Sequence, residues 1–354
     1  MMMKRTCTLR GLASVAASTL ALGTLLTSAV AGAQTHYAIE TKWTIGGEGG
    51  WDYLTMDAAA HRLYVTHGPK VEVLDTTTGK VVGALTGYKS THGVALDPDG
   101  KFGYVSDGAG NAVVVFDRAT LENVATIPAG TNPDGIIFEP KTKTVWAFNG
   151  RSKNVTVIDT NTRKVVATIA LPGKPEFPQA DGTGMVYDNI EDKNEIVKLD
   201  ANTLKLVGEW PMGGCESPSG MAMDLKGHKL FSVCDGKKMA VTDFTTGKVL
   251  GLAEVGDGPD AAGFDAKTGL AFSSNGDGTL TVVDASSKKF PAVQTLKTLA
   301  GARTMAFDEG TGRVYLAAAV MGPKPAATAQ NPRPRSTALP GSFMVIVVGA
   351  QGSK

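Results

Sequence analysis

The 354-residue sequence is poor in the residue types that mark many protein classes. Only 6% of its residues are aromatic and 19% are charged, and it contains five His, four Trp and three Cys. This composition argues against a coiled coil and against disorder, and a formal charge of +1 offers no support for a nucleic-acid interface. After residue 33 no apolar stretch approaches the roughly 18 residues of a membrane-spanning helix. What is abundant is glycine, with 43 residues, and the apolar content of 42% suffices for a large core.

The first 33 residues are typical of a cleaved secretory signal. Three basic residues within the first ten positions precede an uncharged segment, residues 11–33, which ends in Ala-Gly-Ala. A membrane anchor is the alternative, but the segment is rich in Ala, Ser, Thr and Gly, and Cys7 is badly placed for lipidation. We predict cleavage near Ala33 and a periplasmic or secreted protein. Loss of the three basic residues leaves 32 basic and 34 acidic residues, a formal charge of −2.

An acidic residue recurs every 40 to 43 positions through the rest of the chain. These residues are Asp57, Asp97, Glu139, Asp181, Asp224, Asp265 and Asp308. A second acidic series has nearly the same spacing and comprises Asp75, Asp117, Asp159, Asp200, Asp243 and Asp284. The two series agree on seven repeats of about 42 residues.

Each repeat contains four short apolar segments separated by turn residues such as Asp99 and Gly100. Four strands in about 42 residues are typical of a propeller blade, whereas no repeat has the apolar spacing of a helical solenoid. The sequence therefore predicts an all-β fold, a seven-bladed β-propeller of four-stranded antiparallel blades.

The repeats lack the Gly-His and Trp-Asp signature of WD-type blades. Tyr64-Val65-Thr66, Tyr104-Val105-Ser106 and the outer segment 155–166 instead resemble the YVTN family of propeller repeats, which includes YncE-type periplasmic proteins. The resemblance covers residues 37–349. It implies the propeller fold and, more often than an assigned enzyme, a recognition scaffold.

Residues 34–354 are expected to form a single domain. Its blades lie near 51–90, 91–132, 133–174, 175–217, 218–258, 259–300 and 301–349. Residues 37–46 are similar to the fourth strands of other repeats, and residues 342–349 are similar to a third strand. We therefore expect the N-terminal strand to complete blade seven, which removes a free sheet edge.

The repeat also predicts which side chains meet at the mouth of the central channel. The first strand of each propeller blade lines this channel, and the loops that enter these strands share one face. Five positions before each acidic residue of the first series stand Asp52, His92, Asp134, Glu176, Ser219, Asp260 and Arg303. Because six of the seven are ionisable, we predict a polar, wet mouth. A solvated rim without a ligand is the alternative.

A second ring is expected at the ends of the second strands. It comprises His67, Asp107, Asn149, Cys234, Asn275 and Ala318, with Asn189 taking the place in the repeat of shortened spacing. Turn capping is the alternative role for the three Asn. His67 and His92 belong to adjacent blades, and together with Asp52 and Asp107 they could serve acid-base chemistry or bind a metal.

Cys215 enters the first strand of blade five and Cys234 leaves its second strand. Antiparallel strands bring both residues to the same face, so a disulfide is predicted for an exported protein. Two buried free thiols are the alternative.

Blade seven carries the one large insertion, a Pro-rich loop over residues 321–342. The strand order places it on the same face as the ionisable ring. A disordered surface loop and a lid or partner-binding arm are both open, and Arg333 and Arg335 could reach an anionic ligand beside Arg303.

Two functions of different class follow from this arrangement. The first is an exported scaffold, expected to be monomeric, that binds a small molecule or a protein or cell-envelope partner at the channel mouth. Its ligand-binding candidates are His67, Asp107, Arg303, Arg333 and Arg335.

The second function is a Ca²⁺-type hydrolase similar to the propeller lactonases. By ring position, its metal ligands would be Asp134, Asn149, Glu176 and Asn189, oxygen donors of the kind hard cations prefer. The candidates for catalysis are Asp52, His92 and Asp260. A quinone-cofactor dehydrogenase is a weaker third hypothesis, because the Trp-rich blade motifs of that class are absent.

Overall fold

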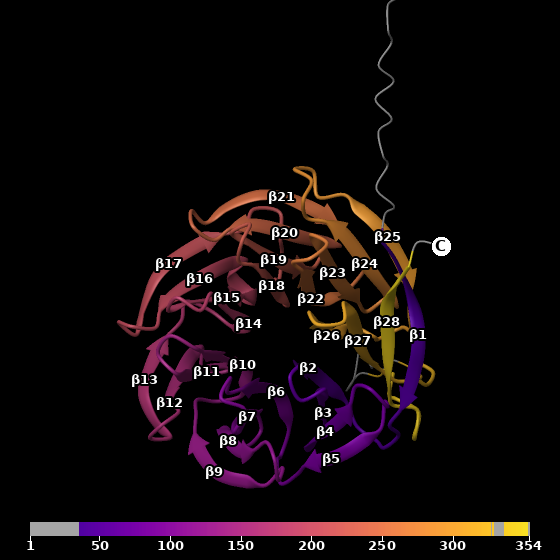
Figure 1. The fold of residues 1–354 in the computed structure, drawn as a ribbon. Coiled ribbons are helices and arrows are strands. Elements are labelled where there is room, and N and C mark those ends of the chain that lie inside the picture. The colour runs from indigo at the N-terminus through magenta and orange to yellow at the C-terminus, as the bar shows by residue number, and fades with distance from the viewer. Residues whose placement is uncertain (1–34, 327, 329–335, 353–354) are drawn as a thin grey trace, which may run out of the picture. The chain divides into compact units, whose positions relative to one another are not determined.

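The computed structural model describes residues 35–326, 328 and 336–352. The predicted signal segment, residues 1–33, lies outside the described residues. The described strands form seven antiparallel sheets of four strands each, which confirms the predicted fold class. Figure 1 shows the sheets arranged as blades around a central channel.

Blades one to four follow one another in sequence order. Blade one contains β2 (Trp51–Asp57), β3 (Arg62–His67), β4 (Lys70–Asp75) and β5 (Val81–Leu85). Blade two contains β6 (Thr91–Leu96), β7 (Phe102–Asp107), β8 (Ala112–Asp117) and β9 (Asn123–Pro128). Blade three contains β10 (Pro133–Glu139), β11 (Thr144–Asn149), β12 (Asn154–Asp159) and β13 (Lys164–Ala170). Blade four contains β14 (Pro175–Ala180), β15 (Met185–Ile190), the 3₁₀ turn η1 (Glu191–Lys193), β16 (Glu195–Asp200) and β17 (Lys205–Pro211).

Blades five to seven complete the ring. Blade five contains β18 (Met221–Asp224), β19 (Lys229–Cys234), β20 (Lys238–Asp243) and β21 (Lys248–Glu254). Blade six contains β22 (Pro259–Asp265), β23 (Leu270–Asn275), β24 (Thr279–Asp284) and β25 (Ala292–Lys297). Blade seven contains β26 (Thr304–Asp308), β27 (Arg313–Ala318), β28 (Met344–Gln351) and, as its outer strand, β1 (His36–Thr44).

The N-terminal strand closes the ring, as predicted. β1 pairs with β28 from His36 opposite Gln351 to Thr44 opposite Met344. In Figure 1 the indigo β1 lies beside the yellow β28 at the outer edge. β28 is therefore paired on both sides, with β27 and with β1, and the ends of the described chain share one sheet.

The core lies between neighbouring blades, and one aromatic side chain per blade occupies the same place in it. The third residue of each second strand is fully or almost fully buried; these residues are Tyr64, Tyr104, Trp146, Tyr187, Phe231, Phe272 and Tyr315. A chain with few aromatic residues thus places seven of them at equivalent positions. Each ring fills the space between two twisted sheets.

The recurring acidic residues cap the turns that follow their strands. The Asp57 carboxylate accepts the backbone N–H of Ala60, and the Glu139 carboxylate accepts the N–H groups of Lys141 and Thr142. Carboxylates of this kind satisfy turn donors that would otherwise lack a partner. Across the described residues, no helix has the length and apolar character needed to cross a membrane.

Candidate functional site

A β-bulge in the inner strands aims the predicted ring residues into the channel mouth. In blade one the register shifts between Trp51 and Leu54, so that Asp52 and Tyr53 together face Thr66 of β3. The inner strands of blades two, three, four and six shift at the same place. The Thr66 hydroxyl accepts the N–H of Asp52, which satisfies a donor that the ladder leaves unpaired. Bulges are a recurrent means of redirecting side chains beside functional sites.

Three ring residues from consecutive blades come together. The Nδ1 atom of His92 lies 2.6 Å from Oδ2 of Asp52 and 3.6 Å from Oδ1 of Asp134. One ligand atom from each residue lies within 4.8 Å of the others. Gly108 leaves room for the imidazole, because a Cβ there would stand 2.4 Å from its Nε2 atom. We call Asp52, His92 and Asp134 the channel-mouth triad.

Two further ring carboxylates carry ion pairs of their own. Lys174, which enters β14, contacts both Glu176 and Glu191 through its ammonium group. Asp260 lies 3.3 Å from the guanidinium of Arg303 in the neighbouring blade. The fifth ring position is not ionisable: it is Ser219, whose hydroxyl donates to the carbonyl oxygen of Pro259. The six ionisable ring members, which we call the rim, therefore fall into three groups: the triad, Glu176 with Lys174, and Asp260 with Arg303.

Burial and crowding of negative charge shift the titration of the rim. Burial raises the pKa of Asp134 to about 6, although the charge of His92 opposes the shift. Burial also raises the pKa of Asp260 to about 6 against the charge of Arg303. Burial and the charge of Asp134 raise the pKa of Glu176, which Lys174 opposes. Burial lowers the pKa of His92, but its hydrogen bond to Asp52 and the charge of Asp134 outweigh burial and raise it to about 9.

The floor of the mouth was not anticipated from the sequence. The ring of Tyr53 packs edge-on against Phe177 of blade four, with 5.0 Å between centroids. Burial raises the pKa of the Tyr53 hydroxyl, and so do the charges of Asp134, Glu176, Asp52 and Asp260. The Tyr53 hydroxyl is therefore subject to the charges of four rim carboxylates. Tyr53 and Phe177 each follow a ring position directly, so the bulge that turns one residue into the channel also exposes its neighbour to it.

The second predicted ring is placed differently from the first. His67 is fully buried and stacks on Phe343, with 4.0 Å between ring centroids. Asp107 is also buried, and its carboxylate accepts the backbone N–H groups of Lys89, Ser90 and Gly110. Neither side chain is exposed at the mouth.

The amides of the predicted metal set are also engaged in the fold. Asn149 donates to the side-chain oxygens of Asn154 and Thr156. Asn189 donates to the carbonyl of Ser219 and accepts the hydroxyl of Ser232. The register further places Ile190 opposite Pro175, as Asn149 stands opposite Pro133, so the ring position assigned to Asn189 is wrong by one residue. Of the four predicted metal ligands, Asp134 and Glu176 lie in the rim.

A groove adjoins the rim between blades seven and one. Its cavity volume is about 520 Å³, and its walls include Trp51, Arg303, Met321 and Lys324. The base of the Pro-rich loop forms part of the groove, because Met321 pairs with Ala338 in an isolated β-bridge. Arg333 and Arg335, the other two predicted anion-binding residues, lie outside the described residues.

The predicted disulfide joins Cys215 and Cys234, with a Cα–Cα distance of 5.4 Å. Both cysteines are buried in the cluster between blades four and five. The bridge fixes the loop that leads into β18, so it supports the one part of the rim whose inner strand is short.

Comparison with known proteins gives one family match and a fold. Residues 54–178, which are 125 of the 354, match the family model described as the SMP-30/gluconolactonase/LRE-like region. No curated protein matches the sequence.

Among solved structures, the chain is similar to one titled Kuenenia stuttgartiensis hydrazine synthase. The two share 17% identity at a TM-score of 0.69, over 76% of this chain and 92% of that one. In all, 1841 chains of solved structures match, so the likeness identifies a widely used fold and no activity. The chain is thus a seven-bladed β-propeller in which residues 54–178 are similar to the SMP-30/gluconolactonase family.

Proposed function

We propose that the protein is a divalent-cation-dependent hydrolase that opens lactones, or cleaves related esters, at the channel mouth. The observation that carries the proposal is the channel-mouth triad, whose three ligand atoms lie within 4.8 Å of one another. The family match supports it, because residues 54–178 include His92, Asp134 and Glu176. The groove beside Arg303 offers room for a substrate.

The donor chemistry and the charge of the rim fit a divalent cation. Carboxylate oxygens and an imidazole nitrogen are common ligands of such ions. Burial is the main cause of the raised pKa values of Asp134, Glu176 and Asp260, and the charges of neighbouring carboxylates add to it. A cation held by the triad would offset this repulsion, with Glu176 of the next blade as a further oxygen ligand.

Such a cation would polarise the ester carbonyl and lower the pKa of a bound water molecule. Asp260 is the proposed general base, because a pKa of about 6 leaves it ionised yet basic near neutral pH. Arg303, whose side chain is 52% exposed, is the proposed binding group for the carboxylate that ring opening releases. Tyr53 and Phe177 would keep the substrate at the mouth by closing the channel beneath it.

A binding protein without catalysis is the second candidate. The ion pairs of Glu176 with Lys174 and of Asp260 with Arg303 favour it, because they partly satisfy the rim within the chain itself. The resemblance to YVTN repeats and the predicted export to the periplasm also fit an envelope recognition protein. In that case the groove lined by Trp51 and Met321 would be the binding surface.

Metal analysis, thermal melts and hydrolysis assays on the purified protein separate the two candidates. We expect bound metal in stoichiometric amount, a higher melting temperature with Ca²⁺, Mn²⁺ or Zn²⁺, and hydrolysis of a panel of γ- and δ-lactones. Asp134→Asn should lose metal and activity. The control Asp257→Asn, an exposed carboxylate in the loop that enters β22, should retain both. If the wild-type protein neither retains metal nor hydrolyses any lactone or aryl ester, the hydrolase proposal fails.

A further inference from the structure

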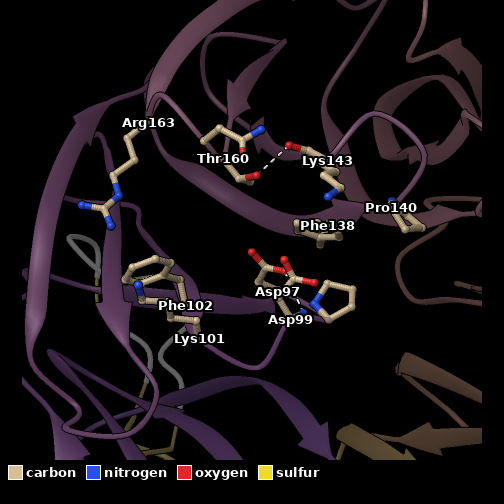
Figure 2. Close-up of a pocket in the computed structure, with 11 residues that line it drawn as sticks. Asp97, Asp99, Lys101, Phe102, Phe138, Pro140, Lys143, Thr160 and Arg163 are labelled. Atoms are coloured by element: carbon tan, nitrogen blue, oxygen red, sulfur yellow. Dashed lines mark hydrogen bonds between the residues drawn. The ribbon is translucent and has the colours of Figure 1, made fainter.

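A second pocket lies away from the channel mouth, between blades two and three (Figure 2). The turns that line it follow the first and third strands, so it belongs to the face opposite the mouth. Its cavity volume is about 360 Å³, which is within the range of small-molecule sites. It shares no lining residue with the groove beside the mouth.

In the neighbouring blade pair an arginine fills the corresponding position. Between blades one and two, the guanidinium of Arg118 forms an ion pair with Asp57 and donates to the carbonyl oxygen of Asp97. Arg118 directly follows Asp117, the last residue of β8. The equivalent residue after Asp159 in blade three is Thr160, whose hydroxyl donates instead to the carbonyl of Lys143. Thr160 carries no charge that could pair with Asp97 as Arg118 pairs with Asp57, and the pocket lies at the corresponding place between blades two and three.

The acidic side of the pocket is left without a counter-charge. Asp97 is the counterpart of Asp57, and its Oδ1 atom accepts only the backbone N–H of Asp99. In the part of the chain that the structure describes, no ion pair involves Asp97 or Asp99. Figure 2 shows both carboxylates projecting into the pocket beside Phe138.

The other walls are aromatic and basic. Arg163 lies over the ring of Phe102, with its guanidinium carbon 4.5 Å from the centroid, and Lys101 lies 5.0 Å from the same centroid. Lys143 stands across the pocket from Phe102, next to Phe138. The pocket therefore combines two carboxylates and two aromatic side chains with three basic side chains, those of Lys101, Lys143 and Arg163, at its edge.

We propose that this pocket binds a guanidinium group carried by a small carboxylate-bearing molecule, the chemistry of arginine. The ligand guanidinium takes a position in this pocket like that of Arg118 between blades one and two, and it pairs with Asp97 and Asp99. Its aliphatic stem packs between Phe102 and Phe138, and its carboxylate faces Lys143 and Arg163. Planar guanidinium groups suit both paired carboxylates and aromatic walls.

Calorimetric titration at low ionic strength tests the proposal with three probes. L-Arginine carries both charged groups, agmatine lacks the carboxylate, and citrulline lacks the cation. We expect L-arginine to bind with Kd on the order of 1 mM or tighter, agmatine more weakly, and citrulline not measurably. The dipeptide Gly-Arg distinguishes the source of the ligand: binding as tight as that of L-arginine assigns the pocket to peptide C-termini, and weaker binding assigns it to the free amino acid.

Two pocket variants guard against mistaking a folding defect in one variant for a loss of L-arginine binding. Asp97→Asn should weaken L-arginine binding at least about tenfold, because it removes a charge-assisted hydrogen bond. Thr160→Arg should abolish binding and raise the melting temperature, because its own guanidinium would fill the pocket as Arg118 does. Asp257→Asn on the opposite face should bind as the wild type does. Absence of L-arginine binding to the wild type at about 10 mM, or unchanged binding in both pocket variants, would overturn the proposal.

Discussion

Because β1 closes the ring, we can predict how much stability the protein loses when Tyr37 of this strand is truncated. This side chain is 1% exposed and its ring lies 5.1 Å from that of Phe272 in blade six. The backbone of Tyr37 is also bound twice by Gln294, at 2.9 Å through its N–H and at 2.7 Å through its carbonyl oxygen. β1 therefore joins blade six to blade seven as well as completing the latter.

Tyr37→Ala should destabilise the protein by about 3–5 kcal/mol, because truncation of a buried aromatic ring removes its contacts and leaves a cavity. For a chain of this size, about 2 °C of melting temperature corresponds to 1 kcal/mol, so the melt should fall by about 6–10 °C. Differential scanning calorimetry measures this shift. Tyr37→Phe, which keeps the ring, should lose far less.

The matched control is Val166→Ala on β13, another outer strand, where the side chain is 49% exposed. Its melting temperature should stay within about 1 °C of the wild type, since exposed substitutions rarely change stability by more than about 0.5 kcal/mol. Deletion of residues 35–46 should lower the melt by more than Tyr37→Ala does. Equal melts for Tyr37→Ala and Val166→Ala would refute the view that β1 secures the ring.

Three further predictions concern single features. Replacing Cys215 and Cys234 together by Ser should cost about 3 kcal/mol in the chain-entropy account of a loop of this length, and a melt unchanged by reductant would contradict it. Arg118→Met should destabilise the fold by about 3–5 kcal/mol, because it leaves the buried Asp57 carboxylate without its partner; urea unfolding of this variant and of Arg118→Lys measures the loss. His92 has a folded pKa of about 9, above its unfolded value, so its contribution to stability is complete below about pH 6.5 and is lost as pH rises through about 9. Melts of metal-free protein across this range should show a decline that is absent in His92→Gln.

The fold could be predicted from the sequence because its repeat positions are fixed by local chemistry. Asp57 and Glu139 recur at one spacing because each turn needs a carboxylate to accept its N–H groups. The spacing of such caps gives the blade length, and the number of caps gives the number of blades. The N-terminal strand was recognisable because its outer-strand pattern had no partner nearby in sequence.

The candidate site was only partly predictable from the sequence. The bulge in the inner strands explains both why some of its residues were predicted and why others were missed. Counting from the caps found Asp52, His92 and Asp134 because the bulge recurs at the same position from blade to blade. The same bulge breaks the two-residue alternation of a strand, so Tyr53 and Phe177 reach the channel although simple alternation would turn them away from it. Contacts between turns, such as that of Lys174 with Glu191 in blade four, depend on turn geometry, which the spacing of residues in the sequence does not reveal.

Because every blade has the same frame, each position can be compared with six internal counterparts. The residues equivalent to Asp188 in the pairing of the second strands are Val65, Val105, Ala147, Ser232, Ser273 and Leu316. Asp188 is fully buried, and within the described residues its carboxyl group has no hydrogen-bond partner other than the backbone of Glu176. Burial raises its pKa well above the usual range, as do the charges of Glu176 and Asp134.

A buried polar group whose hydrogen bonds are incomplete costs up to about 1–3 kcal/mol, and none of the six counterparts of Asp188 is an acid. Packing therefore does not account for Asp188, whereas its nearness to two rim carboxylates connects it with the channel mouth. At the pocket on the opposite face the comparison singles out Arg118, because the residues after the other third strands are Thr76, Thr160, Ala201, Phe244 and Ala285. A departure from the repeat that reduces stability thus marks the channel mouth, whereas the pocket on the opposite face is marked by its cavity and by two carboxylates, Asp97 and Asp99, that form no ion pair among the described residues.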